Sequence, residues 1–281
     1  MKTITLLTSL LMSLSTFLHA QVLDSTYIVC QYKANTIKVT AQKRIKDLIR
    51  LEIGKNISKS YSIYTARSDS FKLSPDYRAQ SMEMTKQITA SLKSGVKLGE
   101  AIERSGMPRV CELMVTYKNY PEGKITVLDR IDKQYMYEDE LNSQQWEILP
   151  DTMTILGYVC QKATTEWRGR KYEAWFAPEL PISDGPLKFG GLPGLIFKIK
   201  DEKDEYSYEM EGIEKKEVPI KMDVPIKQNK FIETSRKKFK KAYWNYLENF
   251  GTIMSEKTGI KAGSKAKFDK EKDYDFLETD Y

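Results

Sequence analysis

The chain has 281 residues, of which 45 are basic and 39 acidic, and its formal charge of +6 is spread through a mixed composition. That balance favours a solvated surface over nucleic-acid binding. The single histidine is His19, so the rest of the chain excludes catalytic pairs and metal sites that depend on imidazole.

The first residues predict a secretory signal peptide. Lys2 precedes an apolar stretch from about Ile4 to Leu18, and small Ala20 follows it, as in a signal cleaved after Ala20. The alternative is an uncleaved anchor, but the stretch is shorter than the roughly 20 apolar residues that a membrane span needs. We therefore expect residues 1–20 to be removed and residues 21–281 to form one domain. We expect that domain in the periplasm, at the outer membrane or outside the cell, without a transmembrane span.

Three cysteines lie in a chain destined for an oxidising compartment. One disulfide and one leftover thiol is the simplest arrangement. All three pairings of Cys30, Cys111 and Cys160 stay open, and we favour Cys111 with Cys160 because both lie in strand-like segments. No CxxC spacing is present, so a redox motif or a structural zinc site is not expected.

The first half of the chain predicts strands interrupted by a helix. Residues 27–33, 46–53 and 58–66 have extended patterns. Ser74 and Pro75 are typical of a helix start and Gly95 of a helix end, which predicts a helix near 75–94 within a helical insertion at about 75–105.

From residue 110 to residue 177, short strand-like runs alternate with turn signals. Arg168-Gly169-Arg170 is one such signal and predicts a hairpin. Short turns between successive strands favour antiparallel pairing. Further on, we expect a helix near 229–250, followed by a charged, irregular tail. The basic run Arg236–Lys241 is interpreted as an exposed helix face, with an anionic envelope surface as the alternative.

The segment 178–194 joins two predicted strands and contains four prolines and four glycines. Loops of this length inside a compact domain are uncommon and tend to be functional. Since proline fixes φ, we expect a rigid lid across the sheet. At its end, Leu192-Pro193-Gly194-Leu195 predicts a type II turn with Gly194 at positive φ. The spacing fits neither a P-loop nor a dinucleotide-binding loop.

This turn lies within the six-residue motif Gly191, Leu192, Pro193, Gly194, Leu195 and Ile196. The stretch of about 110–215 around it resembles the GLPGLI family of exported proteins from Bacteroidetes. The resemblance implies a β-rich envelope protein and supplies no reaction, cofactor or catalytic residue. The expected fold is mainly β (α+β), a curved antiparallel sheet with the form of an open half-barrel.

The favoured function is a non-catalytic binding module that holds an apolar ligand or a partner segment under the 178–194 loop, without a cofactor. Its candidate site residues are Trp167, Trp175, Phe176, Phe189 and Asp184. The alternative is that the four rings belong to the core. A second hypothesis is a scaffold or assembly factor that docks on an outer-membrane partner. A third is a hydrolase using carboxylates such as Asp184, Glu173 and Glu179.

Overall fold

A computed structural model describes residues 22–38, 43–222, 231–258 and 277–280. The predicted signal peptide lies outside these residues. The strands are β1 (Val22–Lys38), β2 (Lys43–Gly54), β3 (Ser58–Ser62), β4 (Val115–Lys118), β5 (Lys124–Arg130), β6 (Gln134–Glu140), β7 (Glu147–Ile155), β8 (Tyr158–Trp167), β9 (Arg170–Ala177), β10 (Leu195–Asp201), β11 (Tyr206–Glu214), β12 (Pro219–Lys221) and β13 (Ile232–Ser235). The helices are α1 (Ile63–Leu73), α2 (Tyr77–Lys93), α3 (Leu98–Arg104) and α4 (Arg236–Thr258).

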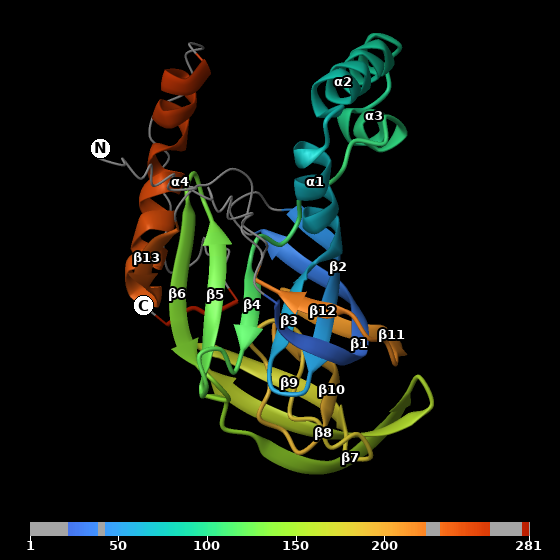
Figure 1. Cartoon of the computed structure of the whole chain (residues 1–281), viewed down its shortest axis with the longest axis vertical. Helices are drawn as coiled ribbons and strands as arrows, with labels where there is room; N and C mark the ends of the chain where they lie inside the picture. Colours follow the sequence, from blue (N-terminus) through green and yellow to red (C-terminus); the bar gives the residue numbers. More distant parts are fainter. Residues whose placement is uncertain (1–21, 39–42, 223–230, 259–276, 281) are drawn as a thin grey trace, which may run out of the picture.

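One 13-stranded sheet organises the molecule (Figure 1). Its order is β13-β6-β5-β4-β3-β2-β1-β11-β10-β9-β8-β7, with β12 paired to β1. The chain therefore runs outward from β1 to β6, crosses to β7 at the other end, and returns strand by strand until β11 pairs with β1. The pairs along this path are antiparallel except β13 with β6, which is parallel. The mainly β prediction is confirmed, and the sheet is not closed into a barrel.

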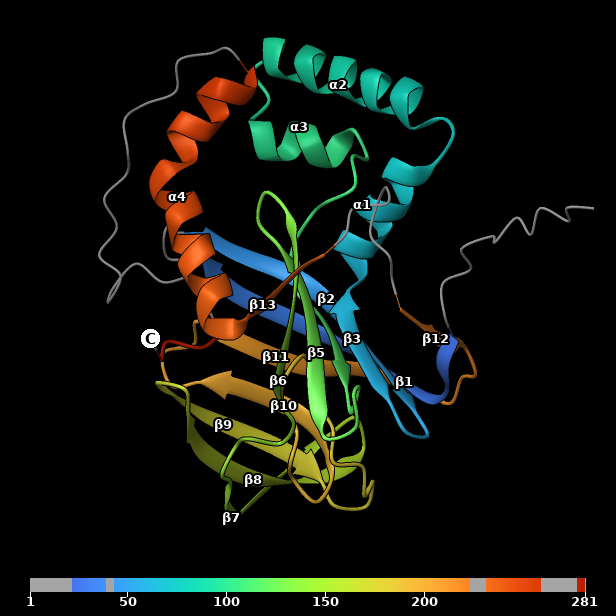
Figure 2. The same cartoon turned by 60° about the vertical axis from the view of Figure 1, so that its left-hand side comes forward.

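The helices differ from the prediction in their bounds. Residues 63–66, predicted as strand, begin α1, because the Ser62 side chain accepts a hydrogen bond from the Thr65 amide and caps a helix there. The predicted helix near 75–94 is confirmed as α2, but Ser74 ends α1 and Asp76 is the N-cap of α2. Together α1, α2 and α3 form an arm that projects from the sheet (Figure 2). Among the described residues, no helix is long and apolar enough to cross a membrane.

Helix α4 begins at Arg236, later than the sequence suggests. Residues 229 and 230 lie outside the described ranges, and 232–235 form β13 instead, since they pair in parallel with β6. The Ser235 hydroxyl then accepts a hydrogen bond from the Lys238 amide at 3.4 Å. Helix α4 packs along β6, where Phe239 stacks on Tyr137.

The loop 178–194 lies between the two halves of the sheet. Besides its attachment to β9 and β10, its Leu187 amide donates to Ser60 of β3, and its Leu187 carbonyl accepts from Thr116 of β4. Its apolar residues Leu187, Phe189 and Leu192 are at most 1% exposed. The loop is therefore part of the main core and not a lid over it.

The type II turn predicted at Leu192–Leu195 is wrong. The positive-φ glycine of the motif is Gly191, at φ 86°, whereas Gly194 is not among the positive-φ residues. Gly194 is required for another reason, since a Cβ there would clash with the Ala177 carbonyl oxygen of β9. The motif thus uses Gly191 for its positive φ and Gly194 for a close approach to the β9 backbone. In contrast, the Arg168-Gly169 hairpin has positive φ at both residues, as a two-residue turn of this class requires.

The Cys111–Cys160 disulfide is absent from the structure. Cys30, Cys111 and Cys160 are all free thiols. Cys160 lies on β8 with its Sγ directed to the Tyr158 carbonyl, whereas Cys111 precedes β4 and faces the Lys46 carbonyl of β2. The two segments belong to opposite halves of the sheet, which sequence spacing does not reveal.

Candidate functional site

Strand β9 places two of the residues predicted to contact a ligand on opposite faces of the sheet. Its burial alternates, so that Tyr172, Ala174 and Phe176 point into the core, and Glu173 and Trp175 point outward. Adjacent strand residues face opposite sides of a sheet. Phe176 is 1% exposed in the core, while half-buried Trp175 lies under the Lys162 ammonium on the outer face. These two rings cannot line one site.

The remaining predicted rings fill the core. The Phe189 ring centroid lies 5.6 Å from that of Trp167, 4.9 Å from that of Tyr172 and 6.3 Å from that of Tyr208. Such edge-to-face and tilted packing occupies the space beneath the loop. The predicted apolar cavity under 178–194 is therefore filled by the protein's own aromatic side chains.

Asp184, the other predicted site residue, lies at an open pocket of about 350 Å³. Its Oδ1 atom accepts from the Lys118 ammonium at 2.5 Å, and that ammonium also donates to the Gly185 and Phe189 carbonyl oxygens at 2.6 Å each. Burial lowers the pKa of Lys118, and Asp184 opposes that shift. The pair anchors the loop to β4, and its two opposite charges both belong to the pocket lining.

The rest of this Asp184 pocket is mainly neutral and polar. Besides Asp184 and Lys118, its lining consists of Tyr27, Ile53, Gly54, Lys55, Asn56, Ile57, Ser58, Asn119, Leu141, Asn142, Ile182 and Ser183. The residue before the motif shapes this wall, because a Cβ on Gly190 would lie 2.8 Å from the Asn142 Oδ1 atom. The glycine therefore lets the Asn142 amide lie against the loop. Amides, hydroxyls and one carboxylate suit a ligand with many hydroxyl groups.

Ser58 contributes an unused hydroxyl to the pocket. The residue is 5% exposed, and its Oγ is buried with no hydrogen-bond partner among the described parts of the chain. Buried polar atoms are nearly always hydrogen-bonded, so an unpaired one is a position where ordered water or a ligand can bind. Ser58 is the strongest sign that the Asp184 pocket accepts a polar ligand or ordered water.

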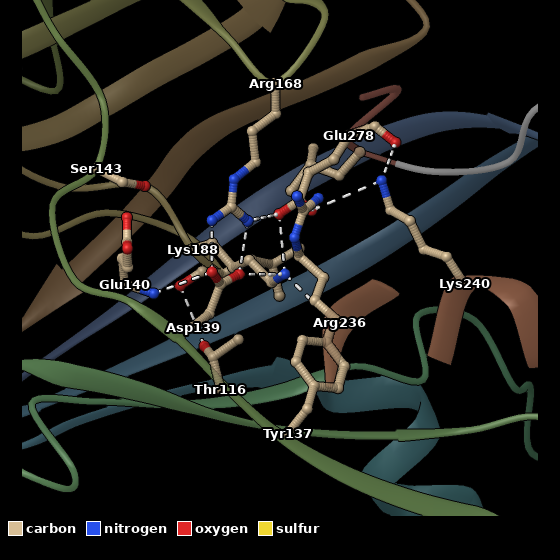
Figure 3. Close-up of polar contacts among 12 residues, drawn as sticks. Thr116, Tyr137, Asp139, Glu140, Ser143, Arg168, Lys188, Arg236, Lys240 and Glu278 are labelled. Atoms are coloured by element: carbon tan, nitrogen blue, oxygen red, sulfur yellow. Dashed lines mark hydrogen bonds and ion pairs between the residues drawn. The ribbon is translucent and has the colours of Figure 1, made fainter. Parts of the chain in front are cut away.

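The same loop also carries Lys188 into a buried cluster of charges (Figure 3). Its ammonium lies 2.9 Å from Asp139 Oδ2 of β6 and 2.9 Å from Glu278 Oε1. Arg168, from the β8–β9 turn, contacts both Asp139 oxygens and also Glu278 at 2.8 Å. Arg236 of α4 adds a further contact to Glu278 at 2.8 Å. Five distant segments of the chain thus meet at one point.

The cluster keeps its members charged. Burial alone would raise the pKa of Glu278, but Lys188 and Arg168 hold that pKa below its ordinary value. Burial acts on Asp139 in the same way, and its hydrogen bonds to Arg168 and the charge of Lys188 lower its pKa. Burial would lower the pKa of Lys188, yet Glu278, Tyr137 and Asp139 raise it. Each charge is therefore stabilised by its neighbours.

The carboxylates considered for hydrolysis do not converge. Asp184 pairs with Lys118, Glu173 lies on the outer face 2.9 Å from the Lys162 ammonium, and Glu179 is exposed. The described residues contain no group of three or more acidic, cysteine or histidine side chains that could hold a metal ion.

Comparison with known proteins gives one family match. Residues 110–241 match the family model described as N-glycanase peptide, N-terminal domain. Two solved structures of PNGF-II, in different space groups, align with 80% of this chain at 14% and 15% identity, each with a TM-score of 0.47. The chain spans about a third of their length, 34% and 33%. No curated protein matches.

The resemblance to the GLPGLI family is therefore wrong as a family assignment. The model that matches the stretch containing Gly191–Ile196 is that of the N-glycanase N-terminal domain. Sequence reasoning also missed Lys118, Lys188 and Glu278, which hold the loop and the cluster together. The sequence signal for these contacts was a single lysine beside apolar or aromatic residues, Lys118 in VTYK and Lys188 in PLKFG. A lysine enclosed by such residues requires a partner for its charge.

Proposed function

We propose that this protein is an exported, non-catalytic binding module and that the Asp184 pocket holds one unit of a hydroxyl-rich ligand, such as a sugar of a glycan. The buried, unpaired Ser58 hydroxyl carries this proposal. The amides of Asn56 and Asn142 in the lining offer both donors and acceptors, whereas the Asn119 amide is bonded to Asn56 and Gly123. The volume of about 350 Å³ suits one small ligand.

The chemistry of the pocket supports a polar ligand over the apolar ligand predicted from the sequence. Asp184 and Lys118 balance each other, which leaves Lys55 as the remaining charged residue of the lining. Tyr27 is 47% exposed at the pocket and offers a ring surface beside the polar groups. The family match supports the same ligand class, because the matched description names an N-glycanase.

Binding without catalysis is supported by the arrangement of the acidic groups. Asp184 is held by the Lys118 ammonium and by the Gly185 amide, so its Oδ1 atom is already occupied. Paired-carboxylate hydrolysis needs a second carboxyl group across the bond that is cleaved. Asp184 is the only carboxylate among the residues that line the described pocket.

Calorimetric titration of the full chain tests the proposal, with the N-acetylglucosamine disaccharide and a mannose oligosaccharide as probes. We expect at least one probe to bind and Ser58→Ala to weaken it about tenfold, since one hydrogen bond is lost. Ser74→Ala is the matched control, because its buried hydroxyl also has no partner in the described chain but lies at the end of α1. Absence of binding by both probes, or equal losses in the two variants, would contradict the proposal.

A further inference from the structure

Residues Leu277–Asp280 contact four cationic side chains. Arg168 comes from the β8–β9 turn, Lys188 from the 178–194 loop, and Arg236 and Lys240 from successive turns of α4 (Figure 3). We call these four side chains the cationic cradle. These residues form no helix or strand, in line with the irregular tail predicted, and Leu277 and Glu278 are only 6% and 3% exposed.

The cradle contacts the backbone of this segment as well as its side chains. The amides of Thr279 and Asp280 donate to the Arg168 carbonyl oxygen at 2.8 and 3.1 Å. The Lys240 ammonium donates to the carbonyl oxygens of Glu278 and Asp280 at 3.1 Å each. The Tyr172 hydroxyl donates to the Leu277 carbonyl. Contacts of this kind, backbone bonds for affinity and side-chain pockets for selectivity, characterise peptide-binding sites.

Three side chains of the segment have distinct positions. Leu277 packs into the main core, which selects an apolar residue. Glu278 meets Lys188, Arg168 and Arg236, which selects a carboxylate. Asp280 lies 2.7 Å from Arg236 at the rim, where its side chain is 36% exposed. The cradle therefore distinguishes an apolar residue, an acid and a second acid two positions later.

Charge complementarity determines what fits the cradle. Outside the segment, the Asp139 carboxylate of β6 contacts Arg168 and Lys188. Arg236 and Lys240 are paired with Glu278 and Asp280 of the segment. Removing the segment would take the Glu278 carboxylate from Arg168, Lys188 and Arg236, which favours another acidic occupant.

We propose that the cationic cradle is a binding site for acidic peptide segments with the pattern apolar–Glu–x–Asp, and that the chain's own residues 277–280 are an exchangeable occupant. The ligand from outside is a segment of a partner protein with this pattern. Exchange requires an incoming carboxylate in the place of Glu278, because removing one partner of a buried ion pair is strongly destabilising. The intramolecular occupant has the advantage of high effective concentration, so an outside segment binds measurably only once that advantage is removed.

The experiment uses the full chain with a protease recognition sequence inserted between residues 259 and 276. After folding and cleavage, gel filtration measures how much of the released segment stays bound. A synthetic peptide of residues 272–281 is then added as competitor. We expect the segment to stay bound after cleavage and the peptide to displace it. A Glu278→Gln peptide should need a concentration at least about tenfold higher, since it loses the charge-assisted contacts.

A second variant, in the chain itself, separates loss of binding from loss of folding. Because Lys188 is enclosed and its substitution would destabilise the fold, Arg236→Gln is used, whose side chain is 24% exposed. It should release the segment at a lower competitor concentration than the unmodified chain does, with an unchanged circular dichroism spectrum. Loss of the segment on cleavage alone, no displacement at saturating peptide, or equal displacement by the Gln peptide would each overturn the proposal.

Discussion

Lys188 and Glu278 are ninety residues apart in the chain, and their Nζ and Oε1 atoms lie 2.9 Å apart. The two side chains are 1% and 4% exposed, so water screens this ion pair very little. The pair joins the 178–194 loop to residues 277–280.

Breaking this pair should destabilise the fold strongly. We expect Lys188→Met to lower the free energy of unfolding by about 3–5 kcal/mol, because Glu278 and Asp139 would lose a buried cation. Urea unfolding followed by tryptophan fluorescence measures the loss. Lys86→Met is the control, since its pair with Glu83 is exposed at 70% and 61% and should change stability by less than about 1 kcal/mol. Similar losses in both variants would contradict the buried-pair interpretation.

The cluster should also determine how stability responds to acid. The pKa of Glu278 is lowered from its ordinary value of 4.5, so the folded protein holds its negative charge more strongly than the unfolded chain. The stabilisation is therefore complete above pH 4.5 and is lost as the pH falls through the lower folded pKa. We expect Glu278→Gln to be less stable than the wild type at pH 7, with the difference narrowing toward pH 3. A constant difference across this range, in thermal unfolding, would contradict the assignment.

The close approach at Gly194 should make even alanine costly there. A Cβ would clash with the Ala177 carbonyl and lie 3.0 Å from the Phe176 ring, and we expect Gly194→Ala to cost about 1–3 kcal/mol. Gly99→Ala in α3 is the matched control, since a Cβ there has no neighbour within 4 Å and should stabilise the helix by about 0.5–1 kcal/mol. Calorimetric melting of both variants checks the prediction, and a stabilised Gly194→Ala would refute it.

The three thiols should differ in reactivity. Cys30 and Cys160 are fully enclosed, and burial raises the pKa of Cys160 to about 11, whereas Cys111 is half-buried. Alkylation of the native protein, read by mass spectrometry, should label Cys111 first and reach the others only on unfolding. Peptide mapping without reductant should find no link between Cys111 and Cys160. Detection of that link would restore the disulfide predicted from the sequence.

Local features of the fold were predictable because they depend on neighbours in the chain. The alternation in β9, the Arg168–Gly169 turn and the helix near 75–94 each follow from spacing or a single turn residue. Helix α1 was missed because the start of a helix at Ser62 interrupts a continuous extended pattern. The basic run of α4 was only partly understood. Lys237, Lys238 and Lys241 are exposed, but Arg236 and Lys240 turn inward toward Glu278.

The sequence by itself determined that the protein is mainly β, that imidazole chemistry is confined to His19, and that the stretch 178–194 is unusual. Only the tertiary structure decided what that stretch does. Phe189 enters the core, Asp184 meets Lys118, and Lys188 meets Glu278, because β1 and β11 pair and bring the two halves of the sheet around the loop. Charged residues this far apart in the sequence show no spacing pattern that would predict their pairing. Their attraction becomes strong only after folding has removed the water around them.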